Sequence, residues 1–151
     1  MNTNKISEHT KEVLKKNGWY EGRVYDIAFW VSELEKEGYK LNDYAKLILN
    51  ELGNIYVRES SSEIYVSATF DFNPYNSASG EYDRLEEFES ASEDKIFPIG
   101  ALQDYIVYAG LSKKIYLGDW EGLYIAGNSI EEYLENVFKR GYEPIKILLD
   151  R

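Results

Sequence analysis

The spacing of hydrophobic residues changes near residue 53, and this change constrains the fold more than any other feature of the sequence. Before it, apolar residues recur every three to four positions, which is typical of helices with one buried face. After it, apolar and polar residues alternate from Ile64 to Phe72, which is typical of a strand with one buried face. Helices and strands in separate stretches predict an α+β domain.

Three helices are expected in the first 53 residues, over 7–17, 27–37 and 42–52. Each has a polar residue suited to cap its start or a glycine suited to end it. The candidate caps and stops are Ser7, Gly18, Asp26, Gly38 and Gly53.

A meander of strands is expected next. Residues 55–58 precede the alternating strand, and the polar residues 59–63 predict a turn between the two, so that a hairpin ends at Asn73-Pro74. After a break at Phe97-Pro98, three short strands are expected over 104–109, 114–117 and 122–126, with turns at 110–112 and 118–122.

A late helix is expected to begin at Ser129, which can form a capping box with Glu132, and to run to Phe138 before Gly141. The apolar tail over 144–149 is too short to assign to helix or strand. Residues 1–151 are therefore expected to form a single α+β domain with N-terminal helices, an antiparallel sheet and a late helix.

The composition leaves little material for catalysis. The chain has no cysteine, and its single histidine, His9, is expected on an exposed helix face. One chain therefore supplies neither a thiolate nucleophile nor a two-histidine metal site. Neither a glycine-rich phosphate loop nor a calcium loop is present. No catalytic residue, cofactor or metal is expected.

Carboxylates are the remaining candidates for chemistry. Adjacent acids occur at Glu86/Glu87 and Glu131/Glu132, and a near pair at Asp119/Glu121. Adjacent positions on a helix do not face each other, and a chain with 27 acids contains such pairs by chance. A carboxylate-dependent hydrolase is the less favoured alternative.

The net charge of −10 bears on partners. A negative field repels nucleic acids and anionic membranes and attracts basic proteins. The N-terminus lacks the apolar core of a signal peptide, and no apolar run is long enough to span a membrane. A cytoplasmic protein that binds neither nucleic acid nor membrane is expected.

More than half of that charge lies in an acidic segment, residues 81–94, which holds seven acids and one arginine. The segment is either a solvated loop or helix face, or a docking face for a basic protein whose aromatic residues act as anchors. The candidate partner-binding residues are Tyr75, Glu81, Tyr82, Asp83, Glu86, Glu87, Phe88, Glu89, Glu93 and Asp94.

Five short motifs follow one another in an order that resembles the third subgroup of the SUKH superfamily of bacterial immunity proteins. They are Gly-Trp-Tyr-Glu-Gly-Arg at 18–23, Leu-Asn-Glu-Leu-Gly at 49–53, Phe-Asp-Phe-Asn-Pro at 70–74, Phe-Pro-Ile-Gly at 97–100 and Ser-Ile-Glu-Glu-Tyr-Leu at 129–134. The resemblance covers residues 13–141. The family often has two glycines after its third helix, whereas Gly53 is followed here by Asn54.

The resemblance implies a mixed α+β domain that binds and neutralises a secreted polymorphic toxin, often a nuclease or a nucleic-acid deaminase, without catalytic residues of its own. A regulatory or scaffold module unrelated to toxins remains the alternative. The motif residues are expected to support the fold, Trp19 by packing, Arg23 through a buried or interfacial ion pair and the prolines by shaping turns. They are Gly18, Trp19, Arg23, Gly53, Phe72, Pro74, Phe97, Pro98 and Gly100.

Overall fold

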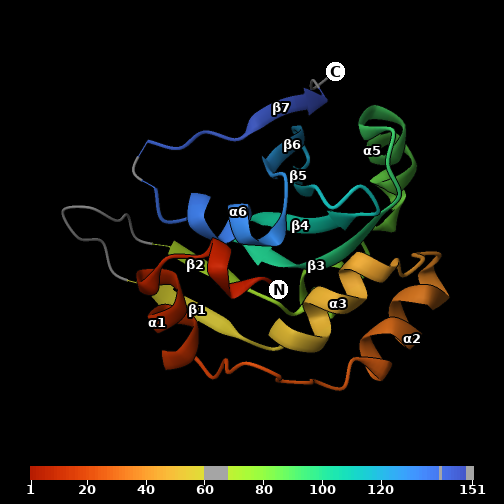
Figure 1. The fold of residues 1–151 in the computed structure, drawn as a ribbon. Helices are drawn as coiled ribbons and strands as arrows, with labels where there is room; N and C mark the ends of the chain where they lie inside the picture. The colour runs from red at the N-terminus through yellow and green to blue at the C-terminus, as the bar shows by residue number, and fades with distance from the viewer. Residues whose placement is uncertain (60–67, 140, 149–151) are drawn as a thin grey trace.

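A single seven-stranded antiparallel sheet organises the chain (Figure 1). The computed structural model describes residues 1–59, 68–139 and 141–148. The order of the strands in the sheet is their order in the sequence, so that each strand pairs with the one before it and no connection crosses the sheet. The strands are β1 (Tyr56–Glu59), β2 (Ala68–Asp71), β3 (Ile96–Leu102), β4 (Tyr105–Gly110), β5 (Ile115–Asp119), β6 (Gly122–Gly127) and β7 (Ile145–Leu148).

The three predicted N-terminal helices are confirmed as α1 (Glu8–Lys16), α2 (Ala28–Glu37) and α3 (Asp43–Leu52). The Ser7 side chain caps α1 by accepting the N–H of Thr10. Asp26 lies one residue further from α2 than expected, but its carboxylate still accepts the N–H of Ala28 at 3.0 Å. Hydrogen bonds to side chains just before each helix therefore fix where α1 and α2 begin.

Shorter helices fill the second half of the chain. They are α4 (Pro74–Ala78), α5 (Leu85–Ser92), α6 (Ile130–Asn136) and the 3-10 turn η2 (Tyr82–Arg84). A second 3-10 turn, η1 (Thr3–Lys5), precedes α1. Ser129 caps α6 as predicted, but this helix ends two residues before Phe138. The tail forms β7, an edge strand of the sheet, which the sequence left open.

Helices cover both faces of the central strands. From α5, the Phe88 ring packs against Tyr108 of β4, with 5.9 Å between the ring centroids, and against Gly118 of β5. On the opposite face, Tyr133 of α6 packs against Phe70 of β2. Because β3 is covered on both sides, its first five residues are all buried.

Hydrogen bonds connect the first helix, α1, to the last helix, α6. The Glu135 carboxylate of α6 accepts the Ser7 N–H at 3.2 Å, the Ser7 hydroxyl at 3.3 Å and the hydroxyl of Thr10. His9 lies on this side of α1, half-buried, with its ring 5.0 Å from that of Phe138. The prediction of an exposed His9 was therefore wrong.

The break expected at Phe97-Pro98 is also wrong, because both residues lie inside β3. The pairing of β3 with β4 shifts register between Pro98 and Gly100, so a bulge accommodates the missing N–H of the proline. At Gly100 a side chain would collide with the backbone of Asp71, so glycine lets β3 approach β2.

The expected turn over residues 118–122 is shorter than predicted. Gly118 lies in β5 and Gly122 in β6, and only Trp120 and Glu121 form the tip of the hairpin. A side chain at Gly118 would meet the rings of Phe88 and Tyr108. This glycine therefore makes room for α5 on the sheet.

The alternating strand is confirmed where it is described. Ala68, Phe70 and Phe72 are buried, and Thr69 and Asp71 between them are partly exposed. The predicted turn over 59–63, Ile64 and Val66 lie largely outside the described residues. Among the helices of the described ranges, none is long and apolar enough to cross a membrane.

Candidate partner-binding surface

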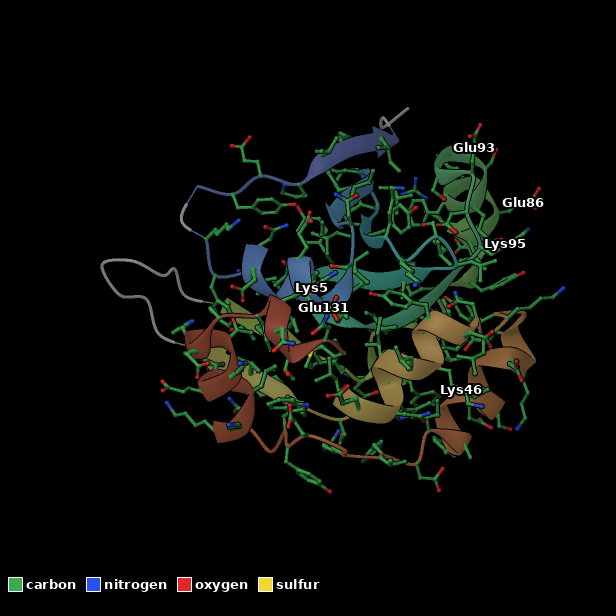
Figure 2. All side chains as sticks on the ribbon, viewed as in Figure 1. Lys5, Lys46, Glu86, Glu93, Lys95 and Glu131 are labelled. Carbon is green, nitrogen blue, oxygen red and sulfur yellow. The ribbon has the colours of Figure 1, made fainter. Side chains whose placement is uncertain are left out.

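The acidic segment contains η2 and all of α5, at one end of the sheet (Figure 1). Leu85 and Phe88, three positions apart, face the sheet and are buried. Glu86 and Glu93 point away from the protein (Figure 2). The segment is thus a helix with one buried apolar face and one acidic outer face, not a loop.

Asp94 holds the end of this segment to the β4–β5 turn. Its carboxylate accepts the Tyr116 hydroxyl at 2.7 Å, the Ser112 N–H at 3.2 Å and the Ser112 hydroxyl. Burial, together with the hydrogen bond to Asp94, raises the pKa of Tyr116 to about 12. Asp94 therefore serves the fold as a hydrogen-bond acceptor at the edge of the core.

Two further acids are also engaged within the protein. Glu89 accepts the N–H of Ile96 at 3.0 Å, and its other oxygen lies 3.8 Å from the ammonium of Lys95. Glu87 accepts from the Arg84 guanidinium at 3.1 Å. Glu89 thus holds α5 to β3, and Glu87 holds α5 to η2, the turn before this helix.

Arg84, the only cation inside the acidic segment, is directed inward. One guanidinium nitrogen donates to the carbonyls of Asp119 and Trp120, at 2.8 and 2.7 Å. The guanidinium also lies over the Phe88 ring, 4.7 Å from its centroid. It therefore joins α5 to the β5–β6 hairpin and leaves the outer carboxylates uncompensated.

Four acids of the segment remain on the outside: Glu81, Asp83, Glu86 and Glu93. Within the described part of the chain, none of the four forms an ion pair with a lysine or arginine. A hollow of about 670 Å³ lies beside α5 and is lined by Glu86, Glu93 and Leu111, among others. The segment thus presents negative charge around a concave surface.

The three predicted aromatic anchors are placed differently from one another. Phe88 is only 3% exposed and belongs to the core, so its ring is not presented to a partner in this structure. Tyr82 is 39% exposed, with its ring 5.1 Å from that of Tyr39. Tyr75 is half-buried beside the exposed Phe29, 5.4 Å between ring centroids.

The sequence did not single out Trp120, which is 73% exposed at the tip of the β5–β6 hairpin. Arg84 holds this tip next to the acidic segment through the two carbonyl contacts. The available signal was a tryptophan in the middle of a predicted turn, where polar residues are usual. It was interpreted only as part of that turn.

Two of the sequence motifs meet at Glu51 of α3. The Trp19 indole donates to the Glu51 carboxylate at 2.8 Å, and Trp19 is buried as predicted. Arg23 donates instead to the backbone carbonyl of Glu51 at 2.7 Å and lies over the Tyr25 ring. The bonded partner of Arg23 is thus a carbonyl and not the carboxylate of the expected ion pair.

The other motif residues also lie within the fold. Gly18 has a φ of 108°, which suits the end of α1. Gly53 has an ordinary φ of −51°, but a side chain there would collide with the carbonyl of Leu49. The left-handed position after α3 is taken by Asn54, with a φ of 67°, which explains why asparagine is tolerated there. Phe72, Phe97 and Pro98 are buried, and Pro74 is the first residue of α4.

One carboxyl lies in a different environment from the acidic segment. Burial raises the pKa of Asp71, at the end of β2, and the N–H of Asn73 donates to its carboxylate at 3.0 Å. This hydrogen bond stabilises the turn into α4. Among the described residues, no group of three or more His, Cys, Asp or Glu side chains is arranged to hold a metal ion.

The fold and this surface define an α+β domain with an acidic concave surface at one end of its sheet. The family model of the SUKH-3 immunity proteins matches residues 6–140, and the chain therefore belongs to the SUKH-3 immunity protein family. Comparison with curated proteins and with solved structures gave no significant match. Membership confirms the resemblance and indicates a role in immunity to a toxin.

Proposed function

We propose that residues 1–151 act as one immunity domain, which binds a cognate bacterial toxin in the cytoplasm and neutralises it by covering its active site. The interaction is stoichiometric binding and not catalysis. The toxin is a protein with a basic surface, such as a nuclease or another enzyme that acts on nucleic acids. This chemistry requires a positive surface on the toxin, because its own substrate carries phosphates.

The observation that carries this proposal is the set of exposed carboxylates without ion-pair partners around α5. Complementary charge accelerates encounter between two proteins and disfavours wrong partners. The family supports toxin immunity as the role, and the acidic surface supports a basic partner. Glu87, Glu89 and Asp94 contribute to this surface indirectly, by holding α5 in place.

Co-expression with the toxin domain encoded by the neighbouring gene tests the proposal. The wild-type chain is expected to restore growth and to co-purify with that domain. Failure of both would refute toxin immunity for this pair. If the toxin is neutralised although its active site remains open to substrate, occlusion is refuted and toxin immunity is not.

A charge-reversal pair tests where the toxin binds. Glu86→Lys/Glu93→Lys is expected to slow association about 3- to 10-fold at low salt, because it reverses two exposed charges on the proposed surface. Glu12→Lys/Glu35→Lys, at exposed positions of α1 and α2, changes the net charge equally and is the matched control. Equal slowing by both pairs would mean that overall charge, and not this surface, steers association.

A further inference from the structure

A second concave surface lies on the hairpin side of α5, between η2, α4 and the β5–β6 turn. It is a groove of about 460 Å³. Its lining includes the aromatic and apolar side chains of Phe88, Ile106 and Tyr108, together with Trp120. The Arg84 guanidinium, which lies over the Phe88 ring, is the one cation of this lining among the described residues, against four carboxylates. Tyr108 and Phe88 are 1% and 3% exposed, so they form part of a packed floor.

Acidic side chains from three separate parts of the chain also line this groove. Glu81 and Asp83 come from the turn before α5, and Asp104 from the turn between β3 and β4. All three are exposed, and within the described residues none forms an ion pair with a lysine or arginine. Asp119 also contributes, although its carboxylate already accepts the N–H groups of Glu121 and Gly122.

The backbone at Trp120 is held in place, while its indole ring is exposed. Arg84 donates to the carbonyls of Asp119 and Trp120 and so fixes the hairpin tip beside α5. The Trp120 ring is 73% exposed on a hairpin tip whose backbone is already held, so a partner that covers the ring need not order this backbone. Tryptophan is enriched among the residues that dominate the binding energy of protein interfaces.

We propose that this groove receives a cationic side chain, arginine or lysine, from a loop of the toxin, and this inference rests on the proposed function. Tryptophan is the best aromatic partner of a cation, and the nearby carboxylates supply opposite charge for the same group. The apolar floor accommodates the aliphatic part of an arginine or lysine side chain. The groove thereby favours a basic protein over a nucleic acid, whose phosphates these carboxylates repel.

Substitutions in the groove test the proposal with the purified toxin domain of the neighbouring gene as the probe. Trp120→Ala and Asp104→Lys are each expected to raise the Kd at least tenfold, and Trp120→Phe to raise it less, because phenylalanine keeps a weaker aromatic face. Phe29→Ala removes an aromatic ring that is 62% exposed on α2 and is the matched control. The expected result for this control is an unchanged Kd.

The outcomes separate this inference from the proposed function. Tight binding that is unaffected by both groove substitutions would overturn the groove as the docking site and leave toxin immunity intact. Absence of any binding by the wild-type chain would overturn both. Unchanged melting temperatures of the variants show that a loss of affinity is not a loss of folding, as expected for exposed residues.

A second measurement tests the chemistry without the toxin. Titration with tri-arginine peptide is expected to shift the NMR signal of the Trp120 indole N–H, while those of the buried Trp19 and Trp30 stay in place. Triglycine is the control peptide and is expected to have no effect. Equal shifts with both peptides, or none with tri-arginine at millimolar concentration, would contradict a cation-binding groove.

Discussion

Adjacent acids of one segment have opposite roles in this protein. Asp94 and Glu89 face inward and accept hydrogen bonds from the sheet and its turns. Glu93 and Glu86 face outward, and no described lysine or arginine forms an ion pair with them. A dense run of acidic residues can therefore contain both the acids that hold a helix in place and the acids on the exposed face of this helix. Their hydrogen-bond partners and their burial distinguish the two groups.

Removal of Asp94 is the strongest way to test this division. Asp94→Ala is expected to lower the free energy of unfolding by about 2–4 kcal/mol, because several hydrogen bonds to a charged acceptor are lost together. Asp83→Ala, an exposed acid of the same segment, is expected to change it by less than about 0.5 kcal/mol. Urea denaturation of both variants measures the difference, and equal losses would abolish the distinction.

Removal of Glu89 is expected to have a smaller effect. Glu89→Ala leaves the N–H of Ile96 without its acceptor at the start of β3, at a cost of about 1–3 kcal/mol. Glu86→Ala on the outer face of α5 is the control, with an expected change below about 0.5 kcal/mol. Hydrogen exchange at the Ile96 amide adds a local measurement, and unaltered protection in Glu89→Ala would argue against this anchor.

The Tyr116–Asp94 hydrogen bond makes the contribution of the inward-facing Asp94 to the free energy of unfolding depend on pH. Tyr116→Phe is expected to lower the free energy of unfolding by about 1 kcal/mol below pH 10. The raised pKa of Tyr116, about 12 in the folded state against 10.0 for an unperturbed tyrosine, means that its hydroxyl favours folding while it is protonated. The wild-type advantage is thus complete below pH 10 and is lost as the pH rises towards 12. Denaturation from pH 8 to 12 measures this, and a constant difference would contradict it.

The smallest effect on stability is expected for the outward acids. Glu86→Lys/Glu93→Lys should change the free energy of unfolding by less than about 0.5 kcal/mol, because both side chains are exposed and outside the ion pairs of α5. Thermal denaturation of this pair beside Glu12→Lys/Glu35→Lys checks the expectation. A clear loss of stability in Glu86→Lys/Glu93→Lys alone would mean that Glu86 and Glu93 support the fold, as Asp94 and Glu89 do.

Local signals in the sequence were sufficient for the helices of the N-terminal half and for the last one. Ser7 and Ser129 cap helices as predicted, and Gly38 ends α2 with a φ of 117°. Capping and periodicity are interactions over a few residues, so the sequence displays them directly. The change from helical to alternating spacing then supplied the α+β class.

Features that depend on contacts between distant residues were missed. Pro98 argues locally against a strand, yet a bulge opposite β4 accommodates it inside β3. The sequence predicts a turn at Gly118, whereas in the structure this glycine lies in β5 and leaves room for the Phe88 ring. Such roles come from neighbours in the tertiary structure, and a single sequence does not identify those neighbours.

The same reason limits the prediction of the site. Charge density located the segment but did not separate Asp94 from Glu93, and aromatic content nominated Phe88, which is buried, while passing over Trp120. The decisive contact is that of Arg84 with the carbonyls of Asp119 and Trp120, 35 and 36 residues away. Periodicity along the chain contains no information about such a pair.

The hydrogen bonds from Ser7 and Thr10 of the first helix to Glu135 of the last have a consequence for synthesis. A ribosome adds about 5–20 residues per second, so roughly 125 residues separate the two partners by on the order of ten seconds. During that interval α1 has no partner in α6, while the strands of the sheet can pair one after another as they emerge. The hydrogen bonds between α1 and α6 therefore form only after Glu135 has been synthesised, and the fold stays incomplete until then.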